Sequence, residues 1–315
     1  MKSHTILGAG GSIGNPLANE LILKGKNVRL VSRSGFSIDK TQSFKADITN
    51  LNEVIEATKD SEVVYICAGL AYDHKIWAVQ WPKIISNSIE ACKVNKSKLI
   101  FFDNVYMYGK VDGKMTEETP YNPVSKKGEI RADIARMLEA EFGKGDIDVS
   151  IARAADLYGP YSTKTSMVYI LALEKMLKGK KGQWLVNPNV THSFTYTLDC
   201  AKSLILLSET SDSFNQVWHL PTLNPAPAGK GFIELISKET GVSPEFSVLS
   251  KWMISLVGIF NKNIGEIKEM LYQNEFDYYF DSTKFEKHFN YKPVSYSEGI
   301  KETILFLKSM HTTVN

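Results

Sequence analysis

The stretch ILGAGGSIG, residues 6–14, decides the fold. It joins a short apolar run to an amphipathic pattern from Ser12 to Lys24, and Gly8, Gly11 and Gly14 recur at every third position. A glycine turn between a strand and a helix lets backbone N–H groups and the helix N-terminus approach a pyrophosphate, because no side chain intervenes. A tight structural turn is the alternative. At the start of a strand–helix series, however, the pattern predicts a dinucleotide-binding fold.

The same alternation of strand and helix continues through the first half of the chain. Further strands are predicted at 27–33, 43–47, 61–69, 97–104 and 147–156, and further helices at 51–59, 76–95 and 129–142. Strands that are separated by crossover helices pair in parallel. The predicted fold class is therefore α/β, a doubly wound (Rossmann) parallel sheet with a smaller C-terminal substrate lobe.

The pattern loosens after about residue 160, and a Pro- and Gly-rich segment at 221–231 marks a boundary. We expect a dinucleotide-binding Rossmann domain at 1–160, with a later contribution from about 195–222. Residues 161–194 and 223–315 are expected to form the substrate-binding lobe.

Composition excludes several classes of partner. The chain has 315 residues, 43% of them hydrophobic and 23% charged, and its net charge of +2 is too small and too evenly spread to suggest nucleic acid. Its apolar runs fall short of the ~20 residues that cross a bilayer, and the N-terminus does not resemble a signal peptide. We therefore expect a small-molecule substrate and neither nucleic acid nor a membrane as partner.

The cysteines and histidines predict no metal site. Cys67, Cys92 and Cys200 are odd in number, widely spaced and set among apolar residues, and the six histidines lack metal-ligand spacing. Such cysteines are typical of a reduced, cytoplasmic protein.

The end of the second predicted strand bears on the choice of cofactor. An NAD site usually has Asp or Glu there, to bind the ribose 2′-hydroxyl. This chain has Ser32, Arg33 and Ser34, with no acidic residue before Asp39. A guanidinium can pair with a 2′-phosphate that a carboxylate would repel, so NADP(H) is preferred over NAD(H). The alternative is that Arg33 is only a surface residue.

Together these motifs resemble the extended short-chain dehydrogenase/reductase superfamily, which holds the NAD-dependent epimerases and dehydratases. The resemblance covers nearly the whole chain: the glycines, KADITN (45–50), ICAG (66–69), VYMYG (105–109), ARAADLYGP (152–160), SFTYTLD (193–199) and the C-terminal ending. It implies a homodimer. It also implies that the cofactor is bound by the glycine turn with Ser12 and Ile13, by Asp47 and Ile48 at the adenine, and by Cys67, Ala68 and Gly69.

The active site departs from the family pattern of a Ser or Thr followed by Tyr-x-x-x-Lys on the next helix. Alignment on that pattern puts Asn104 in the Ser/Thr place, Lys127 in the tyrosine place and Arg131 in the lysine place, an atypical set that lacks the Tyr-x-x-x-Lys pair. Both cations are expected to face the nicotinamide. Tyr106 and Lys110 also read Tyr-x-x-x-Lys, but they lie in a glycine-containing turn without helical register.

These replacements leave several roles open. Lys127 could be a general acid or base, a binder of a substrate anion, or a residue without chemistry. Arg131 can donate hydrogen bonds to ribose hydroxyls, and Asn104 could polarise a carbonyl. The predicted substrate residues are Tyr108, Asp156 and His192. The alternatives are buried packing for Tyr108, a cap or an ion pair for Asp156, and a loop hydrogen bond for His192.

Three functions remain. The first is an NADP(H)-dependent oxidoreductase of the extended type that acts on a small carbonyl or hydroxyl substrate. The second is a nucleotide-sugar epimerase or dehydratase. It is weakened because YQNEFDYYFD (272–281) has none of the arginine or glycine with which nucleotide-sugar members of the superfamily bind the diphosphate. The third is a non-catalytic NADP(H)-binding sensor or interaction protein.

Overall fold

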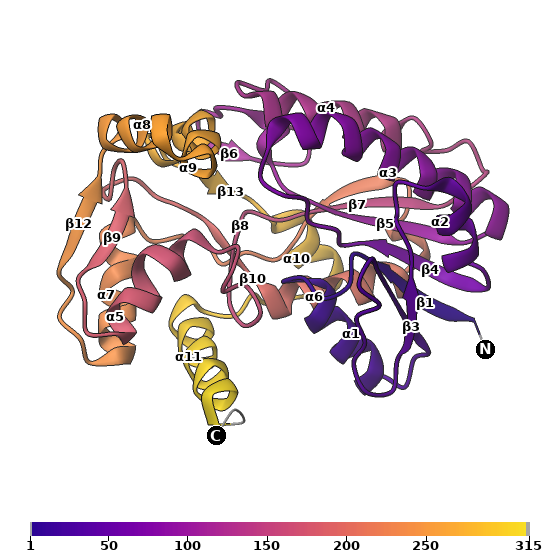
Figure 1. Ribbon diagram of the computed structural model, residues 1–315, viewed down its shortest axis with the longest axis horizontal. Coiled ribbons are helices and arrows are strands. Elements are labelled where there is room, and N and C mark those ends of the chain that lie inside the picture. Colours follow the sequence, from indigo (N-terminus) through magenta and orange to yellow (C-terminus); the bar gives the residue numbers. More distant parts are fainter. Residues whose placement is uncertain (1, 313–315) are drawn as a thin grey trace.

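A computed structural model describes residues 2–312, and its centre is one seven-stranded sheet (Figure 1). The strand order is β11-β7-β5-β4-β1-β2-β3, and every neighbouring pair is parallel. The strands are β1 (Ser3–Leu7), β2 (Val28–Ser32), β3 (Gln42–Lys45), β4 (Ser61–Ile66), β5 (Lys98–Asp103), β7 (Val149–Arg153) and β11 (Gln216–His219). The predicted α/β, doubly wound class is confirmed.

Helices cover both faces of this sheet (Figure 1). On one face lie α1 (Gly14–Leu23) and α6 (Thr197–Glu209), and on the other lie α2 (Leu51–Ala57), α3 (His74–Asn95) and α4 (Lys126–Glu139). Successive side chains of a strand point to opposite faces. Ile6 accordingly packs in the cluster with α1 and α6, whereas Leu7 packs in the cluster with α2, α3 and α4.

Side-chain caps set the start of the three helices on the second face. Asn50 accepts from Asn52 and Glu53 at α2, Asp73 accepts from the Lys75 N–H at α3, and Ser125 accepts from the Gly128 N–H at α4. The cap at Ser125 begins α4 three residues before the predicted start at residue 129. Lys127 and Arg131 therefore lie one turn apart on the same helix.

The rest of the chain forms a smaller lobe with its own aromatic core, which includes Tyr158, Trp184, Phe194 and Phe232. Its helical elements are η2 (Tyr169–Leu173), α5 (Glu174–Leu177), α7 (Gly229–Thr240), α8 (Lys251–Phe260), α9 (Lys262–Ile267), η4 (Lys268–Asn274) and α11 (Tyr296–Thr312). Three small parallel sheets pair β8 (Asp156–Tyr158) with β10 (Phe194–Tyr196), β9 (Gly182–Leu185) with β12 (Phe246–Leu249), and β6 (Lys114–Met115) with β13 (Tyr279–Phe280). The short elements η1 (Tyr106–Tyr108), η3 (Ser211–Ser213) and α10 (Thr283–Phe289) complete the chain.

Two further features bear on the sequence predictions. Cys67, Cys92 and Cys200 are buried and free. Among residues 2–312, no helix has both the length and the apolar character that a membrane span requires.

Candidate active site

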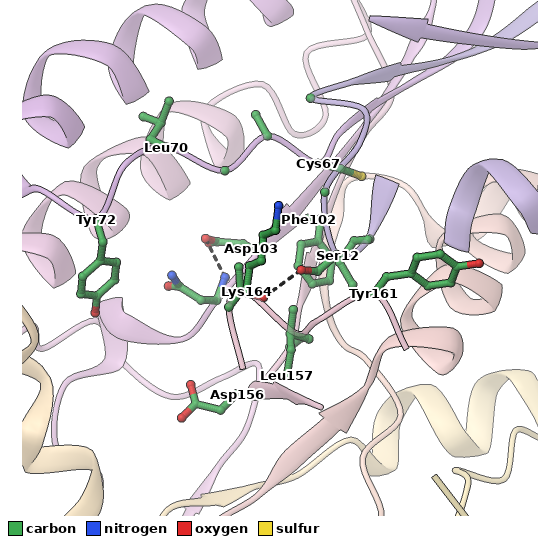
Figure 2. A pocket seen from close by; sticks show the side chains of 18 of the residues that line it. Ser12, Cys67, Leu70, Tyr72, Phe102, Asp103, Asp156, Leu157, Tyr161 and Lys164 are labelled. Atoms are coloured by element: carbon green, nitrogen blue, oxygen red, sulfur yellow. Dashed lines mark hydrogen bonds between the residues drawn. The ribbon is translucent and has the colours of Figure 1, made fainter. Parts of the chain in front are cut away.

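A large cavity of about 1210 Å³ opens at the carboxyl ends of the central strands (Figure 2). One end is lined by the glycine turn, and the other by lobe residues such as Trp184, Phe194 and Gln273. Pockets for one small molecule usually measure about 300–1,000 Å³. The cavity therefore has room for a dinucleotide and a second molecule, at the place where parallel α/β sheets bind ligands.

The glycine turn has no space for a side chain at Gly8 and little at Gly14. Gly8 has φ +88°, and a Cβ there would lie 2.3 Å from the Ala68 Cα. A Cβ on Gly14 would lie 3.2 Å from the Gly8 carbonyl oxygen, although Gly14 itself does not line the cavity. Backbone rather than side chains thus forms this wall, as a pyrophosphate site requires. Gly8, Gly11, Ser12, Ile13, Cys67, Ala68 and Gly69 all line the cavity.

Ser32, Arg33, Ser34, Asp47 and Ile48 line the same end, beyond β2 and β3. Asp47 accepts hydrogen bonds from the Thr49 N–H at 2.9 Å and the Thr49 hydroxyl at 2.8 Å. These bonds, with a smaller contribution from the Arg33 charge, lower the pKa of Asp47. The Ser32 hydroxyl oxygen accepts from the Phe36 N–H, so β2 ends in a hydroxyl beside a guanidinium and not in a carboxylate.

Asn104 and Arg131 line the middle of the cavity. The Asn104 side-chain oxygen accepts from the Tyr106 N–H at 3.1 Å. Arg131 is buried; its Nη1 donates to Asp103 Oδ1 at 3.0 Å, and its guanidinium lies 4.7 and 4.1 Å from the ring centroids of Trp77 and Trp81. Its Nε is buried without a hydrogen-bond partner. Arg131 therefore has N–H donors, the Nε among them, that are not used by the bond to Asp103.

Lys127 does not line the cavity. Its side chain is fully buried, and its ammonium donates to Glu266 Oε2 at 2.5 Å and to Glu269 Oε1 at 2.7 Å. The two cations thus differ: Arg131 faces the cavity, whereas the charge of Lys127 is matched by carboxylates of α9 and η4. A role for Lys127 in proton transfer stays a prediction.

Tyr108 is also outside the lining. Its hydroxyl accepts from Arg153 Nη1 at 2.6 Å and lies 2.8 Å from His219 Nε2, within a buried cluster. The structure does not bring this predicted substrate residue to the cavity.

Asp156 and His192 do line the cavity, and they are bonded to each other. His192 Nε2 is 2.9 Å from Asp156 Oδ2, and the imidazole stacks on Tyr278 at 4.5 Å between centroids. His192 is 1% exposed, and its Nδ1 has no partner. Figure 2 shows the Asp156 carboxylate pointing into the same space as the hydroxyl end of Tyr72.

Two lining residues, Tyr72 and Tyr106, were missed by the sequence reasoning. Their hydroxyl oxygens are 3.5 Å apart. Lys110, the partner of Tyr106 in the literal Tyr-x-x-x-Lys, is exposed and has its ammonium 3.4 Å from the Phe276 ring centroid instead. Tyr106 was set aside with that pair, although its phenol reaches the cavity without Lys110.

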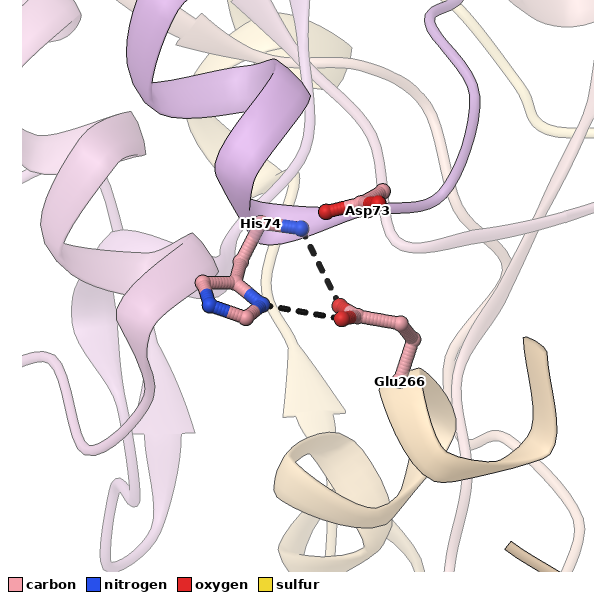
Figure 3. Close-up of side chains that lie close together, drawn as sticks. All are labelled: Asp73, His74 and Glu266. Atoms are coloured by element: carbon pink, nitrogen blue, oxygen red, sulfur yellow. Dashed lines mark hydrogen bonds and ion pairs between the residues drawn. The ribbon is translucent and has the colours of Figure 1, made fainter. Parts of the chain in front are cut away.

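One group of potential metal ligands occurs in the described part of the chain, namely Asp73, His74 and Glu266 (Figure 3). His74 Nδ1 is 2.8 Å from Glu266 Oε1. Ammonium groups already lie on both carboxylates, because Lys262 is 2.5 Å from Asp73 Oδ2 and Lys127 is 2.5 Å from Glu266 Oε2. We interpret the group as an ion-pair network between α3 and α9 and not as a metal centre.

Comparisons with known proteins agree with this geometry. The model of the "NAD dependent epimerase/dehydratase family" matches residues 4–219. An uncharacterized UDP-glucose epimerase, YtcB of Bacillus subtilis, is 23% identical over 212 residues; the match spans 64% of this chain and 64% of that protein, less than two thirds of its length.

Solved structures share the fold over almost the whole chain. MoeE5 in complex with UDP-glucuronic acid and NAD has a TM-score of 0.79 at 20% identity and covers 98% of this chain and 99% of its own. UDP-glucose 4-epimerase from Thermotoga maritima, with UDP-glucose, has a TM-score of 0.81 at 19% identity, with 98% and 99% covered. UDP-glucuronic acid 4-epimerase from Bacillus cereus, with UDP-glucuronic acid and NAD, has a TM-score of 0.80 at 21% identity, with 98% and 100% covered. Since the family model matches well over half of the sequence, the chain belongs to the NAD-dependent epimerase/dehydratase family.

Proposed function

We propose that the chain is a nucleotide-sugar epimerase or dehydratase, which oxidises and reduces a hydroxyl-bearing carbon of an activated sugar beside a bound nicotinamide dinucleotide. The observation that carries the proposal is the cavity, which runs without interruption from the glycine turn to the lobe. Three solved structures of the same fold hold UDP-glucuronic acid or UDP-glucose, and family membership supplies the class of chemistry.

The residues present fit such a cofactor. The backbone of the glycine turn and the N-terminus of α1 would hold the pyrophosphate, Arg33 and Asp47 the adenosine half, and Cys67–Gly69 with Arg131 the nicotinamide half. When bound, the cofactor would accept a hydride from substrate carbon and return it. Asn104 would orient the reacting oxygen, and the Asp156–His192 pair would hold substrate hydroxyls.

Calorimetry with NAD⁺-loaded protein tests the substrate class. We expect UDP-glucose or UDP-glucuronic acid to bind with a Kd in the micromolar to low millimolar range, and NMR to detect a product epimer or a dehydrated sugar. Glucose 1-phosphate, which lacks the nucleotide, is the matched control and should bind at least about tenfold more weakly. Protein that binds NAD⁺ but neither UDP-sugar contradicts the proposal.

A second candidate is an NADP(H)-dependent oxidoreductase for a small carbonyl or hydroxyl compound. One observation favours it: the lobe end of the cavity is mostly apolar, and its described lining residues include no arginine to pair with a diphosphate. Steady consumption of NADPH with simple carbonyl compounds, without UDP-sugar binding, would select this candidate. An epimerase recycles its cofactor and shows no such net consumption.

We also propose that the protein prefers NADP(H) over NAD(H), and this preference depends on Arg33. We expect Arg33→Ala to weaken NADP⁺ binding by about ten- to a hundredfold and to change NAD⁺ binding by less than about threefold, because only the 2′-phosphate needs the guanidinium. Lys45→Ala is the control, since Lys45 is exposed near the same end but outside the lining. Equal effects of Arg33→Ala on both cofactors would contradict the preference.

The cellular compartment and the oligomeric state are also proposals. We place it in the cytoplasm, because its three buried free cysteines need no oxidising compartment. A homodimer stays a prediction that sedimentation or light scattering would test.

A further inference from the structure

Proton transfer at the active site needs a donor that the helix α4 does not supply. That helix contains no tyrosine, and its cavity-lining cation, Arg131, keeps its proton at any useful pH. Asn104 has no titratable proton, and Lys127 lies outside the lining with two carboxylates on its ammonium. A cavity-lining group on another element is therefore better placed than Lys127 to exchange a proton with substrate.

The topology locates the nicotinamide end of the cavity. Arg33 follows β2 and Asp47 follows β3, so the adenosine half would lie over that side of the sheet. The other half then lies over β4, β5 and β7, because a doubly wound sheet binds the two halves of a dinucleotide on the two sides of its first strand. Tyr106 belongs to this end, since it follows β5 and its N–H is bonded to the Asn104 side chain.

The Tyr106 ring is held by aromatic and polar neighbours. It lies parallel to Trp77, with an interplanar angle of 9° and 6.3 Å between centroids, and Arg131 lies 4.7 Å from the same Trp77 ring. The Tyr72 hydroxyl donates a 3.5 Å hydrogen bond to the Tyr106 oxygen. A phenol from η1 and a guanidinium from α4 thus both lie beside the Trp77 ring at the cavity wall.

Burial and the charges around Tyr106 set the protonation state of its phenol. Burial and the Asp156 carboxylate raise the pKa of Tyr106 to about 12, and the Tyr72 hydrogen bond and the Arg131 charge only partly offset them. The other titratable groups that face it are Glu269, Tyr272 and Tyr278. Without cofactor the phenol holds its proton. A cationic ring beside it would favour the phenolate.

We propose that Tyr106 is the catalytic residue that exchanges a proton with the reacting oxygen of the substrate, a role that rests on the proposed function. In the oxidative direction a bound oxidised nicotinamide would supply the hydride acceptor for the electron pair of the substrate C–H bond. The substrate O–H bond breaks at the same carbon, its proton passes to the Tyr106 phenolate, and a C=O bond forms. In the reductive direction the Tyr106 phenol returns this proton to the oxygen.

Other lining groups are less suited to the role. The Tyr72 hydroxyl already donates its hydrogen to Tyr106, and the Asp156 carboxylate is bonded to His192. Both are placed to support Tyr106 rather than to replace it.

Ultraviolet difference titration of the phenols tests the inference without a substrate. Addition of saturating NAD⁺ or NADP⁺ should lower the ionisation midpoint of one tyrosine by about one to two pH units, because the oxidised ring is cationic and the reduced ring is not. NADH or NADPH should not cause this shift. In Tyr106→Phe the shift should vanish. In Tyr272→Phe it should persist, because Tyr272 is a neighbour with a buried hydroxyl that lies outside the lining.

The outcomes separate this inference from the proposed function. A shift that persists in Tyr106→Phe, or no shift in wild type that binds the oxidised cofactor, overturns the role of Tyr106 and leaves the proposed function standing. Protein that binds no nicotinamide dinucleotide overturns both. With a UDP-sugar that is turned over, Tyr106→Phe should lose about 10²–10⁴-fold in kcat with KM changed by less than about threefold. A kcat within about threefold of wild type would also overturn the role.

Discussion

At the scale of single residues, His219 shows how burial selects a protonation state. It ends β11, stacks on Phe280 at 4.1 Å, and places its ring nitrogens 2.8 Å from the Tyr108 hydroxyl and 2.9 Å from the Asp281 carbonyl oxygen. Burial and the nearby Arg153 charge lower the pKa of His219 to about 3. The folded protein therefore keeps this imidazole neutral, whereas the unfolded chain protonates it near pH 6.5.

This difference predicts a loss of stability in weak acid. The contribution of neutral His219 is fully present above about pH 6.5 and decreases as the pH falls from there toward 3, because only the unfolded state gains the proton. Between pH 7 and pH 5 wild type should lose about 2 kcal/mol through this group. His219→Gln, which cannot titrate, should lack that loss in urea unfolding. A stability gap between wild type and variant that does not change with pH would contradict the prediction.

The residues that line the glycine-turn end of the cavity could be predicted because their signal is local. A glycine turn, the Ser32–Arg33–Ser34 end of β2 and Asp47 are each recognisable within a few positions. Lys127 could not be placed this way, since its partners Glu266 and Glu269 are about 140 residues away and carry no motif. Tyr106 was missed for another reason: the pair with Lys110 was set aside because it lies in a turn without helical register, but Tyr106 lines the cavity from that turn without Lys110.

At the scale of elements, the Lys127 network attaches the lobe to the sheet domain. Burial would raise the pKa of Glu266, but hydrogen bonds from Lys127 and His74 outweigh it and lower the pKa to about 2. The network therefore consists of charged groups, and it joins α9 and η4 to α3 and α4.

Removing the Lys127 ammonium should loosen the attachment of the lobe to the sheet domain. We expect Lys127→Met to cost about 3 kcal/mol, because it leaves Glu266 nearly buried without its main partner. Amide hydrogen exchange should accelerate in 262–274 and change little in the central strands. Lys126→Met is the control, since the Lys126 side chain is exposed. Unchanged exchange together with a large loss of turnover would contradict the attachment and instead favour the proton-transfer role of Lys127.

The glycine turn offers a second test of element packing. Gly8 and Gly25 both have positive φ, but a Cβ on Gly8 would collide with the Ala68 backbone, whereas one on Gly25 would meet nothing within 4 Å. Gly25→Ala should therefore cost only the strain of about 1–2 kcal/mol. Gly8→Ala should cost clearly more in urea unfolding and weaken dinucleotide binding at least about a hundredfold, because the turn has to move. Equal costs for the two variants would contradict the collision.

The order of strands and helices in the first half of the chain was predictable because its sequence signal, like that of the glycine turn, is local. Each parallel strand is a short apolar run that is followed by a helical pattern, and the sheet repeats this unit. The lobe was harder, because its two-stranded sheets pair segments far apart in the chain, such as β9 with β12 and β6 with β13. Short strands of two to four residues carry too little periodicity to be identified.

At the scale of the whole molecule, the chain leaves the main sheet after β7, enters the lobe, returns through α6 and β11, and leaves again. Three large buried clusters result: one on each face of the sheet and one in the lobe. The lobe cluster is rich in aromatic residues, and the ring centroid of Phe232 lies 4.9 Å from that of Phe194 and 5.6 Å from that of Tyr296.

Stability should therefore depend on the burial of a lobe phenylalanine and not on its residue type. Phe232 is 1% exposed, whereas Phe260, at the end of α8 in the same lobe, is 86% exposed. Phe232→Ala should cost about 3–5 kcal/mol, through lost transfer free energy and the cavity that it leaves. Phe260→Ala should change the free energy of unfolding by less than about 0.5 kcal/mol. Urea unfolding at matched pH measures both free-energy changes. A cost above about 2 kcal/mol for Phe260→Ala would contradict the prediction, because it would mean that another surface buries Phe260 in solution.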